Sequence, residues 1–593
     1  MHSQHANRDE GPQRFVAIGI DFGTTYSGVC WARSTNPKEV NPITGWASED
    51  HRNQNEVQVP TLYDIPSGKW GYEITPDMKP MKWFKLLLLK NEDIMKEEIR
   101  NAPQLQQARE ILARSRYTTA VQVVGYYLKN VWNHTYATLR SMLDIDNLPL
   151  RVAITIPAIW PAYAQSAMRE AAKIAGIMKY RDIGETTLIL VQEPEAAALA
   201  TLFQRNDSPE IQKNESFVVC DAGGGTVDVI SYKVISERPF MLEECVPGAG
   251  KLAGAFQIDQ AFESYLRGKV KLKISSLKDY DYNQFILREW ELGAKRSFSI
   301  TNAKENYHLH PPSKAYGTLA RLRNKEILTI SKEEMTGFFN KSLTGIRTLV
   351  GDQSKEVKEA TGRLPKKILL VGGLGSSEYV YDVLTEIFSN RVLRPSDGWS
   401  AVARGAVLRL LQENISSQPV KSAVQKAALA ILPDVVSRRS RYHYGILVDF
   451  PIKDVYLEPE DVITENPEGV EVTSRMRWYI SKGEKIDKKS PIQFSYHHYY
   501  RSADFPPKCS FDILYSAQEE EPKRFGSGVL TLCHIECDWD KPISQWQAVG
   551  DPSKGWRKHN DLELSMGFQG EPKWEIRVGS NKREHGFSIE YAN

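Results

Sequence analysis

The sequence has few of the features that mark secreted or membrane proteins. Its 593 residues include only six scattered cysteines, so a disulfide scaffold is not expected. No apolar run approaches the ~18 residues that a membrane-spanning helix needs. The polar first 13 residues also lack the apolar core of a secretion signal. We therefore expect a protein of the cytoplasm, or of cytoplasm and nucleus, with no membrane insertion.

An excess of one charge is also missing. The 76 basic and 74 acidic residues leave a net charge of +2, which gives no general attraction to nucleic acid or anionic membranes. Walker loops, dinucleotide fingerprints and nucleophile elbows are absent from the sequence. A cysteine–histidine cluster at residues 533–537 lacks the second ligand pair of a zinc site, and alternation along a strand explains it more simply.

Two segments of the chain share one unusual pattern. In each, an apolar strand runs into an aspartate and then into a turn of small residues: Asp-Phe-Gly-Thr-Thr-Tyr at 21–26 and Asp-Ala-Gly-Gly-Gly-Thr-Val-Asp at 221–228. A second apolar run follows each turn, which predicts two β-hairpins. Glycines let the backbone approach a ligand, successive N–H groups bind anions, and the aspartate supplies a hard oxygen for Mg²⁺. The doubled pattern predicts two similar lobes that clamp one phosphate–metal unit.

The rest of the chain divides into an α/β part and a β-rich part. A long helical tract is expected from about Pro80 to Asp144, and strands then alternate with helices as far as about residue 412, which predicts an α/β architecture. Beyond about Arg441 the chain is rich in aromatic and β-branched residues and is expected to be mostly β. The predicted organisation is a disordered tail (1–14), a two-lobed domain (15–415; lobe I 15–212 plus 390–415, lobe II 213–389), a linker (416–440) and a C-terminal domain (441–593).

Five segments, in this order, resemble the heat shock protein 70 family of the actin-like ATPase superfamily. They are IDFGTTYS at 20–27, ITIPA at 154–158 with the helix that follows, EPEAAA at 193–198, DAGGGTVD at 221–228 and VGGLG at 371–375. The resemblance covers roughly residues 15–412. It implies an α/β fold, with a two-lobed actin-like (ribonuclease H-like) ATPase domain followed by a smaller, mostly β C-terminal domain. It also implies ATP or ADP and Mg²⁺ as ligands.

The resemblance assigns roles to residues in the two turns and in the connecting segment. Asp21 and Asp221 would hold Mg²⁺, largely through its waters, and Glu193 would orient that water network. The phosphates would lie against both turns: Gly23, Thr24, Thr25 and Tyr26 in the first, and Gly223, Gly224, Gly225, Thr226 and Asp228 in the second. The implied catalytic set is Lys85, Glu193, Asp221, Asp21 and Thr226.

The catalytic lysine of the family is best matched by Lys85, with Lys82 and Lys90 as competitors. It would place the attacking water and neutralise charge on the γ-phosphoryl group, where positioning and electrostatics do most of the catalysis. Without the resemblance, a lysine here is typical of the solvated face of an amphipathic helix.

The adenosine half of the site is implied by two further segments. Lys295, Arg296 and Ser299 match a nucleoside-contacting helix, and Gly372 and Gly373 would let the backbone approach the base and sugar. Two positions depart from the family. Ser376 stands where the family has an arginine that stacks on adenine, and Glu291 is displaced by one residue relative to Lys295. Base specificity therefore stays open.

The C-terminal part departs more strongly from the family. The apolar–acidic linker and the helical lid are not recognisable, which resembles the divergent, lidless branch of twelve-type relatives. The expected function is an ATP-binding, weakly ATP-hydrolysing, chaperone-like protein in which nucleotide drives lobe closure. Its partners would be ATP and, through the β-rich domain, unfolded polypeptide or another protein. Two alternatives remain: a nucleotide-dependent sensor or scaffold with little turnover, and a small-molecule kinase on the same fold.

Overall fold

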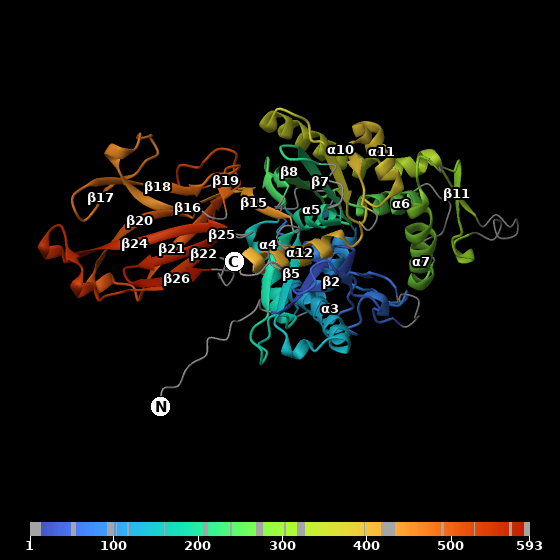
Figure 1. The fold of residues 1–593 in the computed structure, drawn as a ribbon, viewed down its shortest axis with the longest axis horizontal. Coiled ribbons are helices and arrows are strands. Elements are labelled where there is room, and N and C mark those ends of the chain that lie inside the picture. Colours follow the sequence, from blue (N-terminus) through green and yellow to red (C-terminus); the bar gives the residue numbers. More distant parts are fainter. Residues whose placement is uncertain are drawn as a thin grey trace. The chain divides into compact units, whose positions relative to one another are not determined.

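The chain forms two compact units, residues 1–242 with 248–434 and residues 243–247 with 435–593 (Figure 1). The computed structural model describes residues 14–585 except for 49–54, 92–99, 102, 116–117, 159, 205–210, 238–239, 269–276, 302–303, 317–326, 396–397, 417–432, 488–490, 527 and 569–571. The predicted tail and most of the predicted linker lie outside the described residues. No described helix is long and apolar enough to cross a membrane.

The first sheet of the first unit is built around the hairpin predicted at Asp21. Strand β1 (Val16–Phe22) pairs antiparallel with β2 (Tyr26–Arg33) and parallel with β5 (Leu150–Ile156), which in turn pairs parallel with β6 (Thr187–Gln192). The short strands β3 (Asn41–Pro42) and β4 (Gln58–Pro60) complete the sheet on the β2 side. The aspartate therefore stands at the end of a central strand.

The second sheet repeats this arrangement. Strand β7 (Ser216–Ala222) pairs antiparallel with β8 (Val227–Glu237) and parallel with β13 (Lys367–Val371). The strands β9 (Phe240–Glu244), β10 (Ala249–Lys251) and β14 (Val392–Leu393) extend it. The predicted pair of hairpins and the α/β, two-lobed fold class are confirmed.

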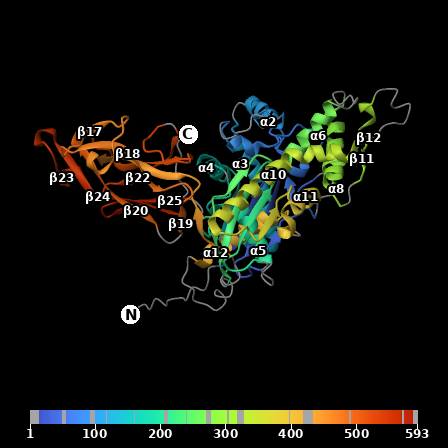
Figure 2. The ribbon, with the colours of Figure 1, turned by 90° about the horizontal axis from the view of Figure 1, so that it is seen from above.

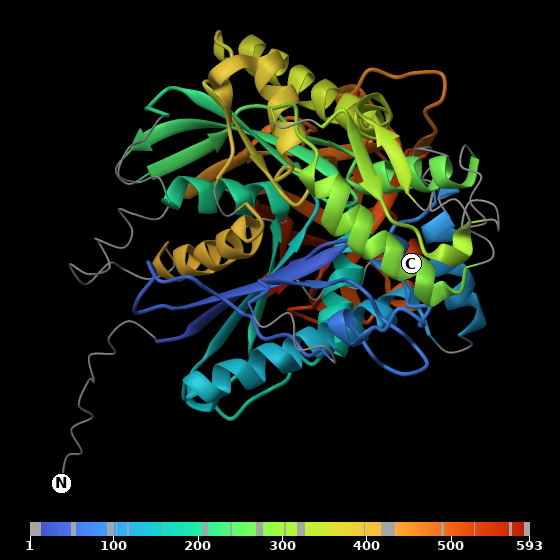
Figure 3. The same cartoon turned by 90° about the vertical axis from the view of Figure 1, so that its right-hand side faces the viewer.

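Helices separate and cover the two sheets (Figure 3). Between the sheets lie α5 (Glu193–Gln204) and α12 (Ala401–Ser416), while α10 (Lys332–Thr361) covers the outer face of the second sheet. The two central helices touch through backbone, because a Cβ on Gly405 would stand only 1.6 Å from the Ala196 carbonyl oxygen. Only glycine permits that approach, and it ties the two lobes together.

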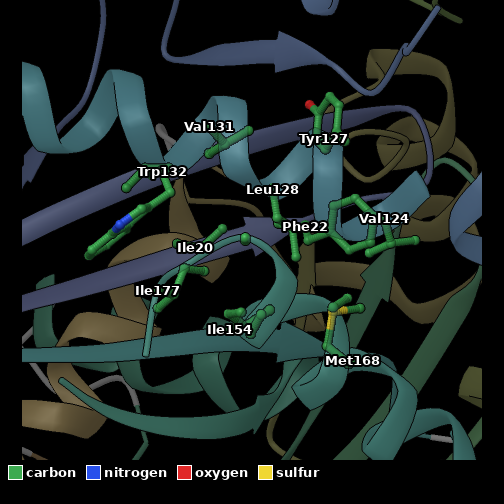
Figure 4. Packing of buried hydrophobic residues seen from close by; sticks show 14 of the residues in the cluster. Ile20, Phe22, Val124, Tyr127, Leu128, Val131, Trp132, Ile154, Met168 and Ile177 are labelled. Atoms are coloured by element: carbon green, nitrogen blue, oxygen red, sulfur yellow. The ribbon is translucent and has the colours of Figure 1, made fainter. Parts of the chain in front are cut away.

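The outer face of the first sheet carries the main apolar core (Figure 4). Helix α3 (Ala120–Met142) presents Val124 and Leu128, four residues apart, to the side chains of Ile20 and Phe22 on β1. Helix α4 (Ala162–Ile174) adds Met168. Side chains from one face of α3 and one face of β1 thus pack in one cluster, which holds the end of β1 in place.

The long helical tract predicted from about Pro80 to Asp144 is wrong in its first part. A short 3₁₀-helix, η2 (Phe84–Leu88), begins after Trp83, whose φ of 60° is left-handed. Within residues 80–91, η2 is the one helical segment, and the described helices α2 (Pro103–Arg114) and α3 follow later in the tract. The left-handed residue interrupts an α-helix at this point, and Lys85, two residues later, is buried.

The remaining elements of the first unit lie mostly toward the far end of the second lobe, where α6, α8, β11 and β12 gather (Figure 2). They are α6 (Phe256–Gly268), α7 (Asp279–Phe285), a π-helix (Ile286–Ala294), α8 (Lys295–Ser297), the pair β11 (Asn306–Leu309) and β12 (Leu328–Ser331), and α11 (Glu378–Phe388).

The second unit is built from antiparallel strands, which confirms its predicted β-rich character. One sheet has the order β17 (Ile463–Glu465), β18 (Glu471–Ile480), β16 (His443–Pro451), β21 (Lys508–Ser516), β22 (Val529–Asp538). The other runs β20 (Ile492–Arg501), β24 (Trp556–Phe568), β25 (Pro572–Val578), β26 (Asn581–His585), with β23 (Gln547–Ala548) on β24. Strand β15 (Asp434–Arg439) pairs with β19 (Lys485–Asp487). No α-helix occurs in the part of this unit that the structure describes.

The cysteine–histidine cluster lies on β22, as expected from strand alternation. Cys533 and Cys537 are buried, whereas His534 and Glu536 between them are exposed. The two kinds of side chain therefore point to opposite faces and do not converge on one metal ion.

Candidate functional site

The tips of the two hairpins meet. A Cβ built on Gly224 would stand 2.2 Å from Thr25 Oγ1, and one on Gly225 would stand 2.7 Å from Thr24 Oγ1. A larger residue at position 224 or 225 would collide with these threonine side chains. The sequence predicted that these turns act together, and the structure places them in direct contact.

The first turn is fixed by its own backbone and by Thr61. A Cβ on Gly23 would lie 2.2 Å from the Tyr26 carbonyl oxygen, so the turn requires glycine there. The Thr61 hydroxyl donates to the Gly23 carbonyl at 2.9 Å, and the Thr61 N–H donates to the Thr25 carbonyl at 2.8 Å. Burial raises the pKa of the Tyr26 phenol, and the nearby Glu291 carboxylate adds to that effect.

The second turn rests on the start of α6. The carbonyl oxygens of Gly223, Gly224 and Gly225 accept backbone N–H groups from residues 254–256 at 3.0–3.2 Å. The Gly223 N–H also donates to the Thr226 carbonyl at 2.9 Å. These bonds hold the turn in one shape before any ligand arrives.

Carboxylates gather behind the two tips. Asp21 and Asp221 are the last residues but one of β1 and β7, while Glu193 begins α5. Burial raises the pKa of Asp21 to about 7, with repulsion from Glu193 as the next cause. Burial also raises the pKa of Asp221 well above its usual value, and Glu193, Asp21 and Asp228 repel its charge in that order. The carboxylates therefore form one largely buried, mutually repelling group, in which Asp21 is the partly exposed member.

Lys85 is the cation of this group. Its Nζ donates to Glu193 Oε1 at 2.7 Å and to the Phe22 carbonyl at 2.5 Å, and the side chain is only 2% exposed. Lys82 and Lys90, the competing candidates, are exposed. Of the three lysines, Lys85 alone reaches the carboxylates in this structure.

The segment before Lys295 forms a π-helix, which the sequence analysis did not predict. A π-turn spans i to i+5 and so accommodates one residue more than an α-turn. That extra residue accounts for the one-residue displacement of Glu291. Glu291 still interacts with Lys295. Burial raises the pKa of the Glu291 carboxyl group, and the positive charge of the Lys295 ammonium works against that rise.

A second partner of Lys295 was also missed. Asp259 on α6 accepts the Lys295 ammonium at 2.6 and 2.8 Å, and the same carboxylate accepts the Trp290 indole N–H at 2.8 Å. No local spacing relates Asp259 to Lys295, which are 36 residues apart in the chain. Ser299 is buried at the end of this segment, and Arg296 is exposed.

The turn at Gly372 packs directly on the carboxylate group. Its φ is +86°, and a Cβ there would lie 2.3 Å from Asp221 Oδ1, so both conformation and space demand glycine. The Ser376 hydroxyl donates to the Gly372 carbonyl at 3.0 Å. A Cβ on the neighbouring Gly373 would stand 3.4 Å from the ring of Trp399, a residue that the sequence analysis did not single out.

The arrangement can cradle an anion between two glycine–threonine turns and place hard oxygens beside it. No group of three or more His, Cys, Asp or Glu side chains among the described residues is arranged to hold a metal ion directly. A cation bound at Asp21 and Asp221 would therefore keep most of its own waters, as Mg²⁺ commonly does.

Comparison with known proteins gives relatives of one family. Heat shock 70 kDa protein 12A of Mus musculus is 21% identical over 473 residues, covering 66% of this chain and 69% of the relative. Heat shock 70 kDa protein 12B of Homo sapiens is 27% identical over 313 residues, covering 42% of this chain and 44% of the relative. A chaperone protein HscA homolog of Acinetobacter baumannii is 24% identical over 418 residues, and the match spans 66% of this chain but only 57% of the relative.

Two family models match the chain. A domain of unknown function, DUF8568, matches residues 438–540 in the second unit. The Hsp70 protein family model matches residues 94–423, which is more than half of the chain, and the first unit has the repeated hairpins and the two-lobed fold described above. The chain belongs to the Hsp70 family.

Proposed function

We propose that this protein binds Mg²⁺–ATP between its two hairpin turns and hydrolyses it slowly, with nucleotide state setting the closure of the two lobes. The observation that carries the proposal is the contact of the threonines of one turn with Gly224 and Gly225 of the other. Two turns of this composition, facing each other, can present backbone N–H groups and hydroxyls to one polyphosphate from opposite sides.

The carboxylates fit a magnesium ion. Asp21 and Asp221 are hard oxygen donors at the ends of equivalent strands, and both have raised pKa values because their charges are buried together. A divalent cation would favour their ionised forms, while Glu193 would orient the waters of the ion. When bound, the ion supplies charge neutralisation for the phosphates.

Lys85 is the proposed group for positioning the attacking water. Its ammonium is held by the Phe22 carbonyl and Glu193, so its place is set by β1 and α5 rather than by a mobile side chain. There it can hold water in line with the terminal phosphorus and stabilise charge on the phosphoryl oxygens as the bond to ADP breaks. The Thr226 hydroxyl, in the second turn, would bind the same phosphoryl group.

For the second unit we propose binding of unfolded polypeptide or of a partner protein. The segment 456–463 exposes large apolar side chains, including Tyr456, which is 88% exposed, and Val462, which is 73% exposed. Apolar side chains gathered in a short segment are available for contact with apolar stretches of another chain. The relative named as a chaperone is consistent with this role.

The test is turnover of radiolabelled Mg²⁺–ATP by the full chain, alone, with an unfolded polypeptide, and with small phosphoryl acceptors such as glycerol and hexoses. The proposal predicts Mg²⁺-dependent binding with slow release of inorganic phosphate. Tight binding without phosphate release would favour the nucleotide-dependent sensor or scaffold. Transfer of label to an acceptor would favour the kinase, and the absence of Mg²⁺–ATP binding would refute the proposal.

A further inference from the structure

An exposed tryptophan stands beside the turn proposed to approach the nucleoside. Trp399 lies just before α12 and is 36% exposed, although most large aromatic side chains of this unit are buried. Its backbone carbonyl accepts the Gln58 side-chain amide at 3.0 Å, which fixes the base of the side chain. The edge of its ring borders Gly373, where even a Cβ would make contact at 3.4 Å.

The indole interacts with a guanidinium from another segment. Arg296 Cζ stands 5.4 Å from the centre of the Trp399 ring, within the range of a cation–π interaction. Arg296 belongs to α8 and Trp399 to the turn that precedes α12, so the pair joins two segments that lie far apart in the sequence. Both side chains are exposed, and the Trp399 ring lies next to the Gly372–Gly373 turn.

The other residues near this turn do not offer a comparable flat surface. Ser376 is short, and its hydroxyl already donates to the Gly372 carbonyl. The Arg394 guanidinium is planar, but it pairs with Glu378 at 2.6 Å and lies over the Tyr381 ring at 4.7 Å. Arg394 is therefore held against α11 and is not available as a platform for a base.

We propose that the Trp399–Arg296 pair is the platform on which the base of a bound purine nucleoside triphosphate stacks. This inference rests on the proposed function, because it assumes that phosphates occupy the two hairpin turns. Stacking tolerates any base with a π-face, whereas discrimination between bases needs hydrogen bonds to their edges. If stacking is the contact that holds the base, the site accepts adenine and guanine alike.

The experiment compares nucleotides with a ligand that has phosphates but no base. Affinities of the full chain for Mg²⁺ complexes of ATP, GTP and inorganic tripolyphosphate are measured by isothermal titration calorimetry. The variants are Trp399→Ala, Trp399→Phe and the control Tyr180→Ala, which removes an aromatic side chain that is 69% exposed in the same unit. Loss of one stacking partner is expected to weaken ATP and GTP binding about tenfold.

The expected pattern is specific to stacking. Trp399→Ala lowers affinity for both nucleotides and leaves tripolyphosphate binding unchanged, Trp399→Phe restores most of the loss, and the Tyr180 control behaves as wild type. ATP and GTP bind the wild-type protein with affinities within about tenfold of each other, since stacking does not distinguish the two bases.

Other outcomes overturn the inference in distinguishable ways. Unchanged or tighter nucleotide binding by Trp399→Ala, or an equal loss of tripolyphosphate binding, refutes the platform and leaves the phosphate site standing. A wild-type preference of more than about a hundredfold for ATP over GTP refutes base tolerance. If wild-type protein binds neither ATP nor tripolyphosphate, the proposed function fails together with the platform.

Discussion

Replacing Asp21 by asparagine should make the metal-free protein more stable while abolishing its binding of Mg²⁺–ATP. Asparagine has nearly the same shape as aspartate, and its carbonyl oxygen can still accept the Thr155 hydroxyl that lies 3.2 Å from Asp21 Oδ1. What it removes is a buried negative charge next to Asp221 and Glu193. The change therefore separates the electrostatic cost of the site from its packing.

The size of the effect follows from the pKa of Asp21, which burial raises from 3.8 to about 7. Between about pH 4 and pH 7 the folded protein holds the proton on Asp21 while the unfolded chain has lost it, so stability falls as pH rises through this window. At ~1.4 kcal/mol per pKa unit, the ionised carboxylate destabilises the fold by up to about 4 kcal/mol above pH 7. Near pH 5 roughly a third of that penalty remains.

The assay is urea denaturation in EDTA at about pH 8 and about pH 5, followed by tryptophan fluorescence, with Asp352→Asn as control. Asp352 is an exposed aspartate on α10 of the same unit, so its replacement should change stability little at either pH. Asp21→Asn should gain about 2–4 kcal/mol at the higher pH and clearly less at the lower one. Saturating Mg²⁺–ATP should reverse the order, because only the wild-type protein gains binding free energy. Equal stabilities of the Asp21 variant and wild type at the higher pH, or a variant that still binds Mg²⁺–ATP normally, would refute the reasoning.

Three further predictions concern catalysis, packing and coupling. Lys85→Met should lower the rate of ATP hydrolysis by about two orders of magnitude with little loss of ATP affinity. Lys82 is exposed, so Lys82→Met should behave as wild type. The reverse result would contradict the assignment of Lys85 as the catalytic lysine. Gly405→Ala should lower the free energy of unfolding by more than about 3 kcal/mol, because its Cβ would collide with the Ala196 carbonyl. Gly337 has open space around it, so Gly337→Ala should be neutral or slightly stabilising in the same denaturation experiment. ATP should change the affinity for a fluorescent unfolded peptide less than ~5-fold, since the family's coupling linker is not recognisable in this sequence, and an anisotropy titration showing a tenfold change would contradict that expectation.

The parts of the fold that the sequence predicted are those set by local chemistry. An apolar run that ends in an aspartate and a glycine turn, followed by a second apolar run, specifies a hairpin, and both hairpins are present with β1–β2 and β7–β8 pairing. Aromatic and β-branched residues after Arg441 predicted the β-rich second unit in the same way. The helical tract from Pro80 failed at its start because periodicity does not report a single left-handed residue such as Trp83.

The sequence predicted the site residues that belong to local motifs. It did not predict those that are brought into the site by contacts between distant residues. Asp21, Asp221 and the turn glycines stand in recognisable motifs, and the structure brings them together. Asp259 meets Lys295 only because α6 packs against the π-helix, and Trp399 meets Arg296 only across the fold. The four-residue spacing from Glu291 to Lys295 was visible, but a π-turn cannot be read from spacing alone.

The electrostatics of the proposed site give a reason why it would take a cation and an anion together. Among the described residues, Lys85 is the ammonium that lies beside this carboxylate group, and it is already paired with Glu193. Magnesium alone would relieve the repulsion between the aspartates, but it would bring its charge close to the Lys85 ammonium. A nucleotide polyphosphate that enters with the metal supplies negative charge for both cations, so each ligand lowers the free energy of binding the other. In the proposed function, the buried lysine would thus favour the Mg²⁺–nucleotide complex over either ligand alone, and the same ammonium would face the phosphoryl group that is transferred to water.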